Sequence, residues 1–252
     1  MSKRTLRTAE VAAAAGVHPN TVRLYEEWGY LPPIPRSRRG YRQFTEAHVA
    51  QMKLARLALQ WPYPGGKEPV AELVRRAAQG DFGRALELAY HYLANVRAEQ
   101  AQAEAAVSFL EQWAAGQVAD RVAQPLSIGQ AAERLDVTRD MLRNWDRNGL
   151  LDVPRHPDNG YRQYGARELG RARVIRMLRQ AGYSVMAILR MLLAFDSGRE
   201  ENLAVALDTP RPDEEVVNVA DRWLSTLATE EQRALDLIQQ LAAMIVAGQS
   251  RN

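Results

Sequence analysis

Arginine is the residue type best suited to chemistry in this chain, and several arginines stand in a pattern that occurs twice. Residues 40–43, Gly-Tyr-Arg-Gln, recur identically as residues 160–163, an offset of 120 (160 − 40). A guanidinium is a planar fork of N–H donors that matches phosphate oxygens, and on a short loop it positions a polyanion without reading its sequence. The arginines suited to that task are Arg38, Arg39, Arg42, Arg155 and Arg162.

The formal charge follows the repeat. Residues 1–60 carry a net +6 and residues 125–200 a net +4, whereas residues 61–124 carry −2 and residues 201–252 carry −5, which sums to the +3 of the chain. Positive charge concentrated on the repeated segments is expected if they face a polyanion. On charge alone, solvated charged surfaces with no partner remain the alternative.

The composition limits the class of protein. With 252 residues, 46% of them hydrophobic and 25% charged, the chain has the make-up of a soluble globular protein, and it shows neither a membrane-spanning run nor an export signal. A cytoplasmic location is expected. The absence of cysteine excludes disulfides and thiolate metal sites, and the four histidines are scattered, so neither a metal nor another cofactor is expected.

Each copy predicts two short helices joined by a tight turn. In the first copy a helix over about residues 8–15 ends at Gly16, and a second begins after His18 at Pro19; in the second copy Ser127 and Thr138 serve as the N-caps. A glycine turn with short extended arms then forms a small hairpin wing, and longer helices follow over about 46–59 and 166–180. A proline-rich insertion at 61–69 occurs in the first copy only.

The second helix of each copy divides into an inner and an outer face. Val22 and Tyr25, and likewise Leu142 and Trp145, are three residues apart and can face inward. The residues left facing outward are suited to base edges, and the candidates for base contacts are Asn20, Thr21, Arg23, Arg139, Met141 and Asn144.

Spread over six spaced elements, the pattern resembles the winged helix-turn-helix of MerR-type transcription regulators. In the second copy the resemblance covers about residues 126–193, through segments such as Leu-Arg-Asn-Trp-Asp-Arg-Asn-Gly-Leu-Leu at 142–151. The first copy resembles the family at 21–31 and 40–44, but it departs from the family at Thr8 and at the insertion.

The resemblance implies that the second helix of each copy enters a major groove of double-stranded DNA. It also implies that the arginine and the aromatic residue of the helix and of the wing grip phosphates on either side. Those residues are Arg23, Tyr25, Tyr41 and Arg42 in the first copy and Arg143, Trp145, Tyr161 and Arg162 in the second, with Thr138 as the adjoining cap. The aromatic residues of the wings, and also Tyr25 and Trp145, have core packing as their alternative role.

Two apolar seams follow the copies. Heptad spacing from Leu86 to Ala114 predicts one long helix over about residues 84–116. A similar seam runs from Val216 to Ile245 and is interrupted at 229–232 by a sequence that resembles a capping box, so two helices are an alternative there.

The expected fold is mainly α: two winged helix-turn-helix domains, each followed by long helices that pair as an antiparallel coiled coil. The expected boundaries are 1–80 for the first winged helix-turn-helix, 81–124 for the long helix and linker, 125–200 for the second winged helix-turn-helix and 201–252 for the C-terminal pairing helix or helices. Relatives with one module per chain dimerise, so a chain with two modules favours a monomeric pseudo-dimer on an asymmetric operator. A homodimer is the alternative.

The predicted function is sequence-specific transcription regulation, in which promoter distortion lets RNA polymerase align with both promoter elements. A small apolar or aromatic effector can be accommodated between the helices by Tyr90, Tyr92, Phe109, Trp113 and Trp223, for which ordinary core packing is the alternative. The competing functions are an architectural DNA-binding protein without an effector and a ligand-sequestering protein with residual DNA-binding modules. No catalytic motif stands out, so the chain is not expected to be an enzyme.

Overall fold

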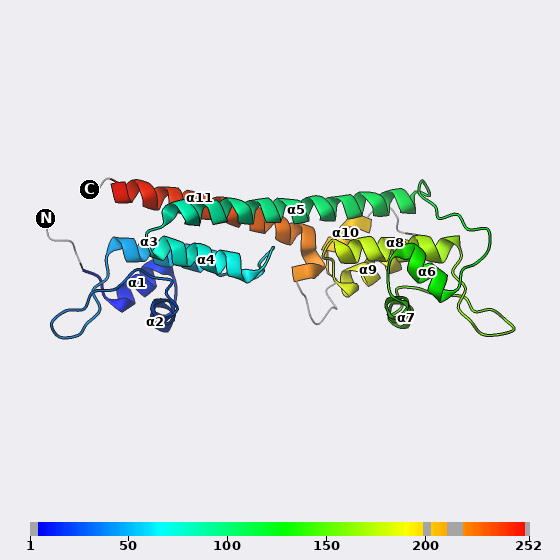
Figure 1. The fold of residues 1–252 in the computed structure, drawn as a ribbon, viewed down its shortest axis with the longest axis horizontal. Coiled ribbons are helices and arrows are strands. Elements are labelled where there is room, and N and C mark those ends of the chain that lie inside the picture. Colours follow the sequence, from blue (N-terminus) through cyan, green and yellow to red (C-terminus); the bar gives the residue numbers. More distant parts are fainter. Residues whose placement is uncertain (1–4, 199–202, 211–218, 250–252) are drawn as a thin grey trace. The chain divides into compact units, whose positions relative to one another are not determined.

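A computed structural model of the chain describes residues 5–198, 203–210 and 219–249. In this structure the chain is divided into two compact units, one formed by residues 1–98 and 227–252 and the other by residues 99–226 (Figure 1). The first unit contains the first helix-turn-helix module and the second unit contains the second module. The long helix predicted over 84–116 is observed as α5 (Phe82–Ala114), and the division at residue 98 assigns its two halves to different units.

The first module is formed by four helices. They are α1 (Thr8–Ala15), α2 (Pro19–Glu27), α3 (Glu46–Ala58) and α4 (Lys67–Ala78). The tight turn forms as the sequence predicts: Gly16 ends α1 in the left-handed conformation at φ 63°, which glycine adopts without a steric penalty. The ring of His18 accepts a hydrogen bond from the backbone N–H of Asn20 at 3.2 Å and so caps α2.

The second module repeats this order. Its helices are α6 (Ile128–Leu135), α7 (Arg139–Arg147), α8 (Ala166–Gln180) and α9 (Val185–Asp196). Thr138 Oγ1 accepts a hydrogen bond from the N–H of Met141 at 3.1 Å, and the Ser127 hydroxyl accepts one from Gln130. Asp136 occupies the turn position that Gly16 holds in the first module and has a positive φ of 50°. Both predicted N-caps are therefore confirmed.

The fold class is mainly helical, as predicted. The described part of the second unit also contains α10 (Leu203–Asp208) and the short 3₁₀ helix η2 (Val219–Arg222). The predicted wings have no regular strand. Within each wing one isolated antiparallel bridge joins the two arms, between Arg36 and Arg42 in the first module and between Arg155 and Arg162 in the second.

From Trp223 onward the C-terminal seam forms one continuous helix, α11 (Trp223–Gln249), so the alternative of two helices separated at 229–232 is wrong. Ala220 of the predicted seam lies in η2. Glu230 explains the continuity, because its carboxylate is buried and accepts hydrogen bonds from the Tyr92 hydroxyl at 2.6 Å and from Arg233 at 2.8 Å. With these partners Glu230 is stable within a helix, and no cap is needed. Val216, the first residue of the predicted seam, lies outside the described residues.

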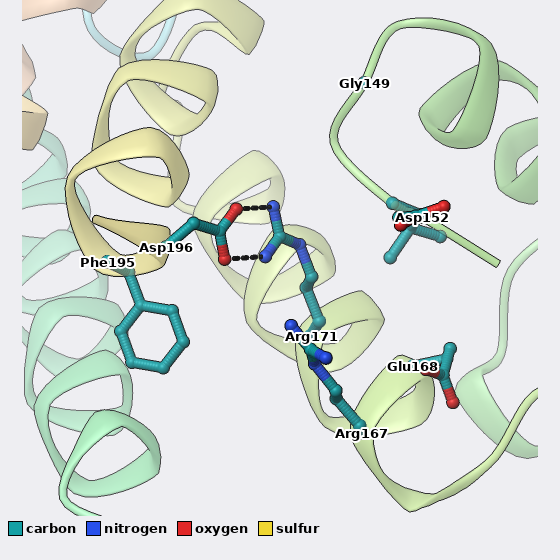
Figure 2. A pocket seen from close by; sticks show the side chains of 8 residues that line it. Gly149, Asp152, Arg167, Glu168, Arg171, Phe195 and Asp196 are labelled. Carbon is teal, nitrogen blue, oxygen red and sulfur yellow. Dashed lines mark hydrogen bonds and ion pairs between the residues drawn. The ribbon is translucent and has the colours of Figure 1, made fainter. Parts of the chain in front are cut away.

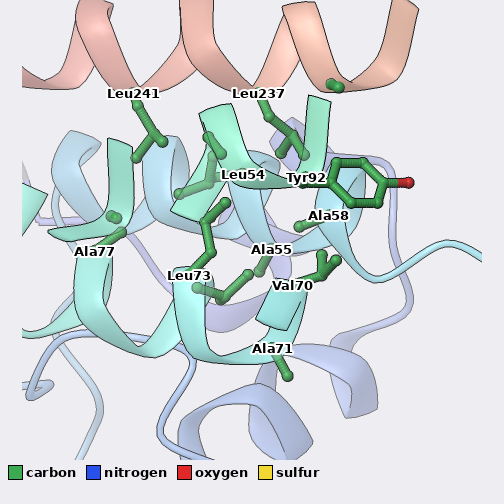
Figure 3. Close-up of a cluster of buried hydrophobic side chains, with 14 of the residues drawn as sticks. Leu54, Ala55, Ala58, Val70, Ala71, Leu73, Ala77, Tyr92, Leu237 and Leu241 are labelled. Atoms are coloured by element: carbon green, nitrogen blue, oxygen red, sulfur yellow. The ribbon is translucent and has the colours of Figure 1, made fainter. Parts of the chain in front are cut away.

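The core of the first unit joins the module to α5 and α11. Figure 3 shows Leu237 and Leu241 of α11 above Leu54, Leu73 and Tyr92, which come from α3, α4 and α5. Arg97 of α5 also pairs with Glu231 of α11 at 2.8 Å. These contacts bury Ala89, Leu93 and Val96 of the α5 seam and partly bury Leu86. Pairing of the two helices as an antiparallel coiled coil stays a prediction.

The core of the second unit uses the remainder of α5. Ala103, Val107 and Leu110 are buried there. Trp113 packs against Phe195 of α9, with their ring centroids 4.6 Å apart. Gly170 of α8 lies against the same indole, where an added Cβ would come within 2.7 Å of the ring nitrogen. Each unit therefore buries its own part of α5.

Candidate nucleic-acid interface

The second helix of each module has the inner and outer faces that the sequence predicts. Val22 and Leu142 are buried at equivalent positions. The predicted base-contacting side chains are exposed or partly exposed: Asn20, Thr21 and Arg23 on α2, and Arg139, Met141 and Asn144 on α7. The two arginines at equivalent positions are oriented by their own helix, since Arg143 pairs with Asp140 at 2.7 Å and Arg23 donates to the Asn20 side chain at 3.5 Å.

The aromatic residues predicted on these helices differ between the modules. Trp145 is only 5% exposed and belongs to the core of the second module. Tyr25 is half-buried, and burial, together with its neighbours Tyr63 and Tyr30, raises the pKa of its phenol. Core packing, the alternative role of both rings, therefore accounts for Trp145 and only in part for Tyr25.

The wing aromatic residues separate into two groups. Tyr41 and Tyr161 are 72% and 75% exposed, whereas Phe44 and Tyr164 have no exposed surface. The backbones of Phe44 and Tyr164 bond to Leu6 and Leu126 respectively, which anchors each wing to the start of its module. The exposed tyrosines are thus available to a partner, and the buried rings belong to the core.

The wing arginines at the repeated position are each bound to an acid of the preceding helix. Arg42 Nε donates to Glu26 at 2.6 Å, and Arg162 donates to Asp146 at 2.8 and 2.5 Å. Glu26 and Asp146 are themselves 120 residues apart, so the pair is duplicated with the module. These two acids were not predicted from the sequence, although the offset of 120 that they share with the arginines was a signal that could have identified them.

The ion pair fixes the angle between each wing and its helix. A charge-assisted contact of this kind holds the guanidinium in one orientation, with some donors engaged by the carboxylate. Arg38 and Arg39, at the tip of the first wing, differ from Arg42. Both are exposed, and neither has an ion-pair partner among the described residues. Arg155 in the second wing instead donates to the carbonyl of Gly160 at 3.2 Å.

The two wings also differ in length on each side of their turn. The N–H of Gln43 donates to the carbonyl of Pro35, and the N–H of Gln163 donates to the carbonyl of Pro154. The two residues that close the wing are therefore eight residues apart in the first module and nine in the second. The arm before the turn shows the opposite difference. Leu31 and Pro35 are four residues apart in the first module, whereas Leu151 and Pro154 are three residues apart in the second. The longer arm of the first wing and the longer turn of the second cancel, so a compensated shift of one residue lies within the constant offset of 120. The tip is Arg-Arg in the first wing and Pro-Asp-Asn in the second.

In each module a polar residue at the equivalent position of the third helix holds neighbouring elements together. Gln51 donates to the carbonyls of Tyr30 at 3.0 Å and Val74 at 2.9 Å. Its counterpart Arg171 donates to the carbonyl of Leu150 at 2.7 Å and forms a two-pronged ion pair with Asp196, at 2.7 and 2.9 Å (Figure 2). Both residues tie the third helix to the loop after the second helix and to the fourth helix.

The residues predicted to bind an effector fall in both units. Tyr90 is exposed and Tyr92 is buried in the first unit, where the hydroxyl of Tyr92 is bound to Glu230. Phe109, Trp113 and Trp223 are partly buried in the second unit. Of these three, Trp113 lines a cavity of about 280 Å³ with Phe195. For Tyr92, core packing accounts for the ring.

The described residues offer neither a metal site nor a membrane span. Residues 5–198, 203–210 and 219–249 contain no group of three or more His, Cys, Asp or Glu side chains placed to hold a metal ion. Among the helices that the structure describes, none combines the length and the apolar character that a membrane span needs.

Comparison with known proteins agrees with this geometry. Residues 6–60 and 126–194 match the family described as MerR HTH family regulatory protein. The chain therefore carries two MerR-type helix-turn-helix modules in tandem.

Individual relatives match over short stretches. The HTH-type transcriptional regulator CueR of Escherichia coli O157:H7 is 36% identical over 55 residues, which are 22% of this chain and 41% of that protein. The mercuric resistance operon regulatory protein of Bacillus cereus is 28% identical over 69 residues, 27% of this chain and 52% of that protein. The chain thus spans about half the length of these relatives or less. No solved structure matches it.

Proposed function

We propose that this protein is a sequence-specific regulator of transcription that binds double-stranded DNA through both modules. The observation that supports the proposal most directly is that the same scaffold presents two exposed helix faces, each flanked by a wing whose repeated arginine is pinned to the helix by an acid. An exposed helix of this kind fits a major groove, and the wings present cations and tyrosines for the flanking phosphates.

We propose further that one chain binds an asymmetric operator with two half-sites. The outward residues of the two helices differ, with Asn20 against Asp140 and Leu24 against Asn144. An asparagine pairs with adenine and a carboxylate accepts from cytosine, so the half-sites should differ in sequence. A monomer would then act as a pseudo-dimer.

The operator is tested by recovering the bound motif from genomic DNA and measuring the mass of the complex by native mass spectrometry. One chain on an asymmetric motif supports the proposal. Two chains on a perfect palindrome would contradict it. Weak sequence preference would instead indicate an architectural DNA-binding protein, and loss of DNA binding altogether would indicate a ligand-sequestering protein.

The wings predict a measurable difference in salt dependence. Arg38→Ala and Arg39→Ala should each lower the slope of log affinity against log salt by about 1, because each removes one phosphate contact. Arg84→Ala, an exposed arginine of α5 paired with Glu87, is the matched control. If both wing variants kept the wild-type slope, the first wing would not contact DNA.

For regulation, we propose that binding untwists or bends a promoter so that RNA polymerase aligns with both of its elements. Phosphate contacts from two linked modules would supply the deformation energy. Transcription in vitro from promoters whose spacer is shortened or lengthened one base pair at a time tests this. A protein effect that does not depend on spacer length would contradict promoter distortion.

A further inference from the structure

A second kind of site lies at the end of the second helix in the first module only. A cavity of about 470 Å³ lies between the C-terminal end of α2, the loop that follows it, the proline-rich insertion and α4. Its polar and aromatic lining consists of Tyr25, Trp28, Tyr30, Tyr63, Lys67 and Arg75. None of these residues except Tyr25 is needed for the DNA contacts proposed above.

The aromatic side chains form a cluster with one open face. The ring of Tyr25 meets that of Tyr30 edge to face, with centroids 5.6 Å apart, and Trp28 lies 6.0 Å from Tyr30. Trp28 is nevertheless 53% exposed. A large indole held against two tyrosines yet open to solvent offers a stacking face for a flat ring.

The two charged residues that line this cavity, Lys67 and Arg75, are both cations. Arg75 lies over the ring of Tyr30 at 6.0 Å and is bound by Glu68 and Glu72, so its charge is compensated locally. Lys67 is exposed and has no ion pair among the described residues. Lys67 also begins α4, whose N-cap Gly66 provides no side-chain cap. The start of a helix and an unpaired ammonium both favour an anion.

The second module lacks the elements of this site. At the positions equivalent to Trp28 and Tyr30 it has Asn148 and Leu150, and the insertion that supplies Tyr63 and Lys67 has no counterpart. The cavity is therefore not a by-product of the shared scaffold. It depends on the features that distinguish the first module.

We propose that this cavity binds a small flat aromatic anion, such as an aromatic carboxylate, with the ring stacked on Trp28 and the carboxylate beside Lys67. Trp28 caps the C-terminal end of α2, and Tyr25 belongs to that helix, so the ligand touches the element that carries the candidate base contacts. Binding therefore changes the DNA affinity of the first module. This last step rests on the proposed function, whereas the binding itself does not.

Isothermal titration calorimetry of the full chain with 2-naphthoate tests the site without DNA. The uncharged analogue 2-naphthamide should bind about tenfold more weakly, because it cannot form the charge-assisted contact with Lys67. Lys67→Gln should weaken 2-naphthoate about tenfold and leave 2-naphthamide within about twofold. Trp28→Ala should weaken both.

Trp61→Ala is the matched control, since Trp61 is an exposed aromatic residue of the same insertion but does not line the cavity. It should leave both affinities unchanged. Absence of 2-naphthoate binding, or equal affinity of both probes for wild type and Lys67→Gln, would overturn the site. Circular dichroism melting of the variants separates loss of the site from loss of the fold.

Anisotropy of a labelled operator, recorded with and without saturating 2-naphthoate, tests the coupling. A change in DNA affinity in wild type that Trp28→Ala abolishes supports it. Calorimetric binding with unchanged DNA affinity would overturn the coupling and keep the site. Calorimetric binding by a protein that binds no DNA would overturn the proposed function instead.

Discussion

The two modules share one scaffold, but several equivalent contacts within it are made by different chemical groups. In the first, Arg56 donates to the carbonyl of Ala15 at the end of α1, at 2.6 Å. In the second, the equivalent Arg176 pairs with Asp136 at 2.7 Å. Both arginines hold the third helix to the turn between the first two. The position of a contact is thus maintained although its acceptor changes from a carbonyl to a carboxylate.

Of two further contacts, one is kept and one changes. The ion pair between wing and helix is the same in both modules, whereas the support behind the helix is a neutral amide in one and a charged fork in the other. The outward helix residues and the wing tips differ most. The duplicated contacts therefore orient the helix and the wing, and we expect the differing residues to determine what each module contacts.

The largest expected effect comes from breaking the core of one unit at a time. Leu93→Asp and Leu110→Asp each bury an unpaired carboxylate in α5, in the first and second unit respectively, and each should cost at least about 3 kcal/mol. Hydrogen exchange should show lost protection in α4 for Leu93→Asp and in α8 for Leu110→Asp. Leu93→Met and Leu110→Met are the controls.

If either aspartate substitution lowered the protection of backbone amides from hydrogen exchange equally in both units, the two units would unfold together and not independently. Unchanged melting for both would mean that neither leucine contributes to a core.

The next effect compares the two supports. Gln51→Ala should cost about 2–3 kcal/mol, because the carbonyls of Tyr30 and Val74 lose a donor in a buried setting. Arg171→Ala should cost about 1–2 kcal/mol, because only one carbonyl, that of Leu150, loses its donor, while Asp196 is partly exposed and water can replace the guanidinium there. Urea denaturation of each variant measures the difference. Arg171→Gln, which installs the residue of the first module, should recover most of the loss.

A larger loss for Arg171→Ala than for Gln51→Ala would reverse this ranking. It would mean that the ion pair, rather than the buried amide, is the more important support.

The smallest effect is a pH dependence that belongs to the first unit. Burial raises the pKa of the Glu230 carboxyl above its ordinary value of 4.5, although the Tyr92 hydroxyl and Arg233 oppose the shift. Above pH 4.5 the folded state therefore binds more protons at this site than the unfolded state, and the free energy of unfolding falls as the pH rises through the raised pKa.

Urea denaturation between pH 4.5 and 7 measures this slope. Glu230→Gln should remove this contribution, and Glu231→Gln, one residue along the same helix, is the matched control. Identical pH profiles for wild type and Glu230→Gln would show that Glu230 has the same pKa in both states.

The sequence predicted the local structure of the modules because short-range signals determine it. Gly16, Thr138 and Ser127 act on the neighbouring backbone, and each has the predicted role. The continuity of α11 was not predictable, since the partner of Glu230 is Tyr92, 138 residues away. For the same reason, the separation of Tyr41 from Phe44 into exposed and buried rings required the fold, because both are aromatic residues of one short segment.

The candidate site was predicted in part. Residue type identified the arginines of the wings, but not that Arg42 and Arg162 are held by acids of another element. The cavity beside Trp28 was missed because its lining comes from three separated segments. The insertion after residue 60 was visible in the sequence, but its contact with the end of α2 was not.

The compensated shift of one residue makes the two wings exchangeable as cassettes. Between the leucine that follows the second helix and the glutamine that closes the wing, residues 32–43 and 152–163 have equal length, although the turn inside them begins at a different place. A chimaera cut at these ends would keep the spacing of both modules and exchange the arms and the tip of each wing together. Cuts made within the wing at the uniform offset would instead lengthen one turn and shorten the other.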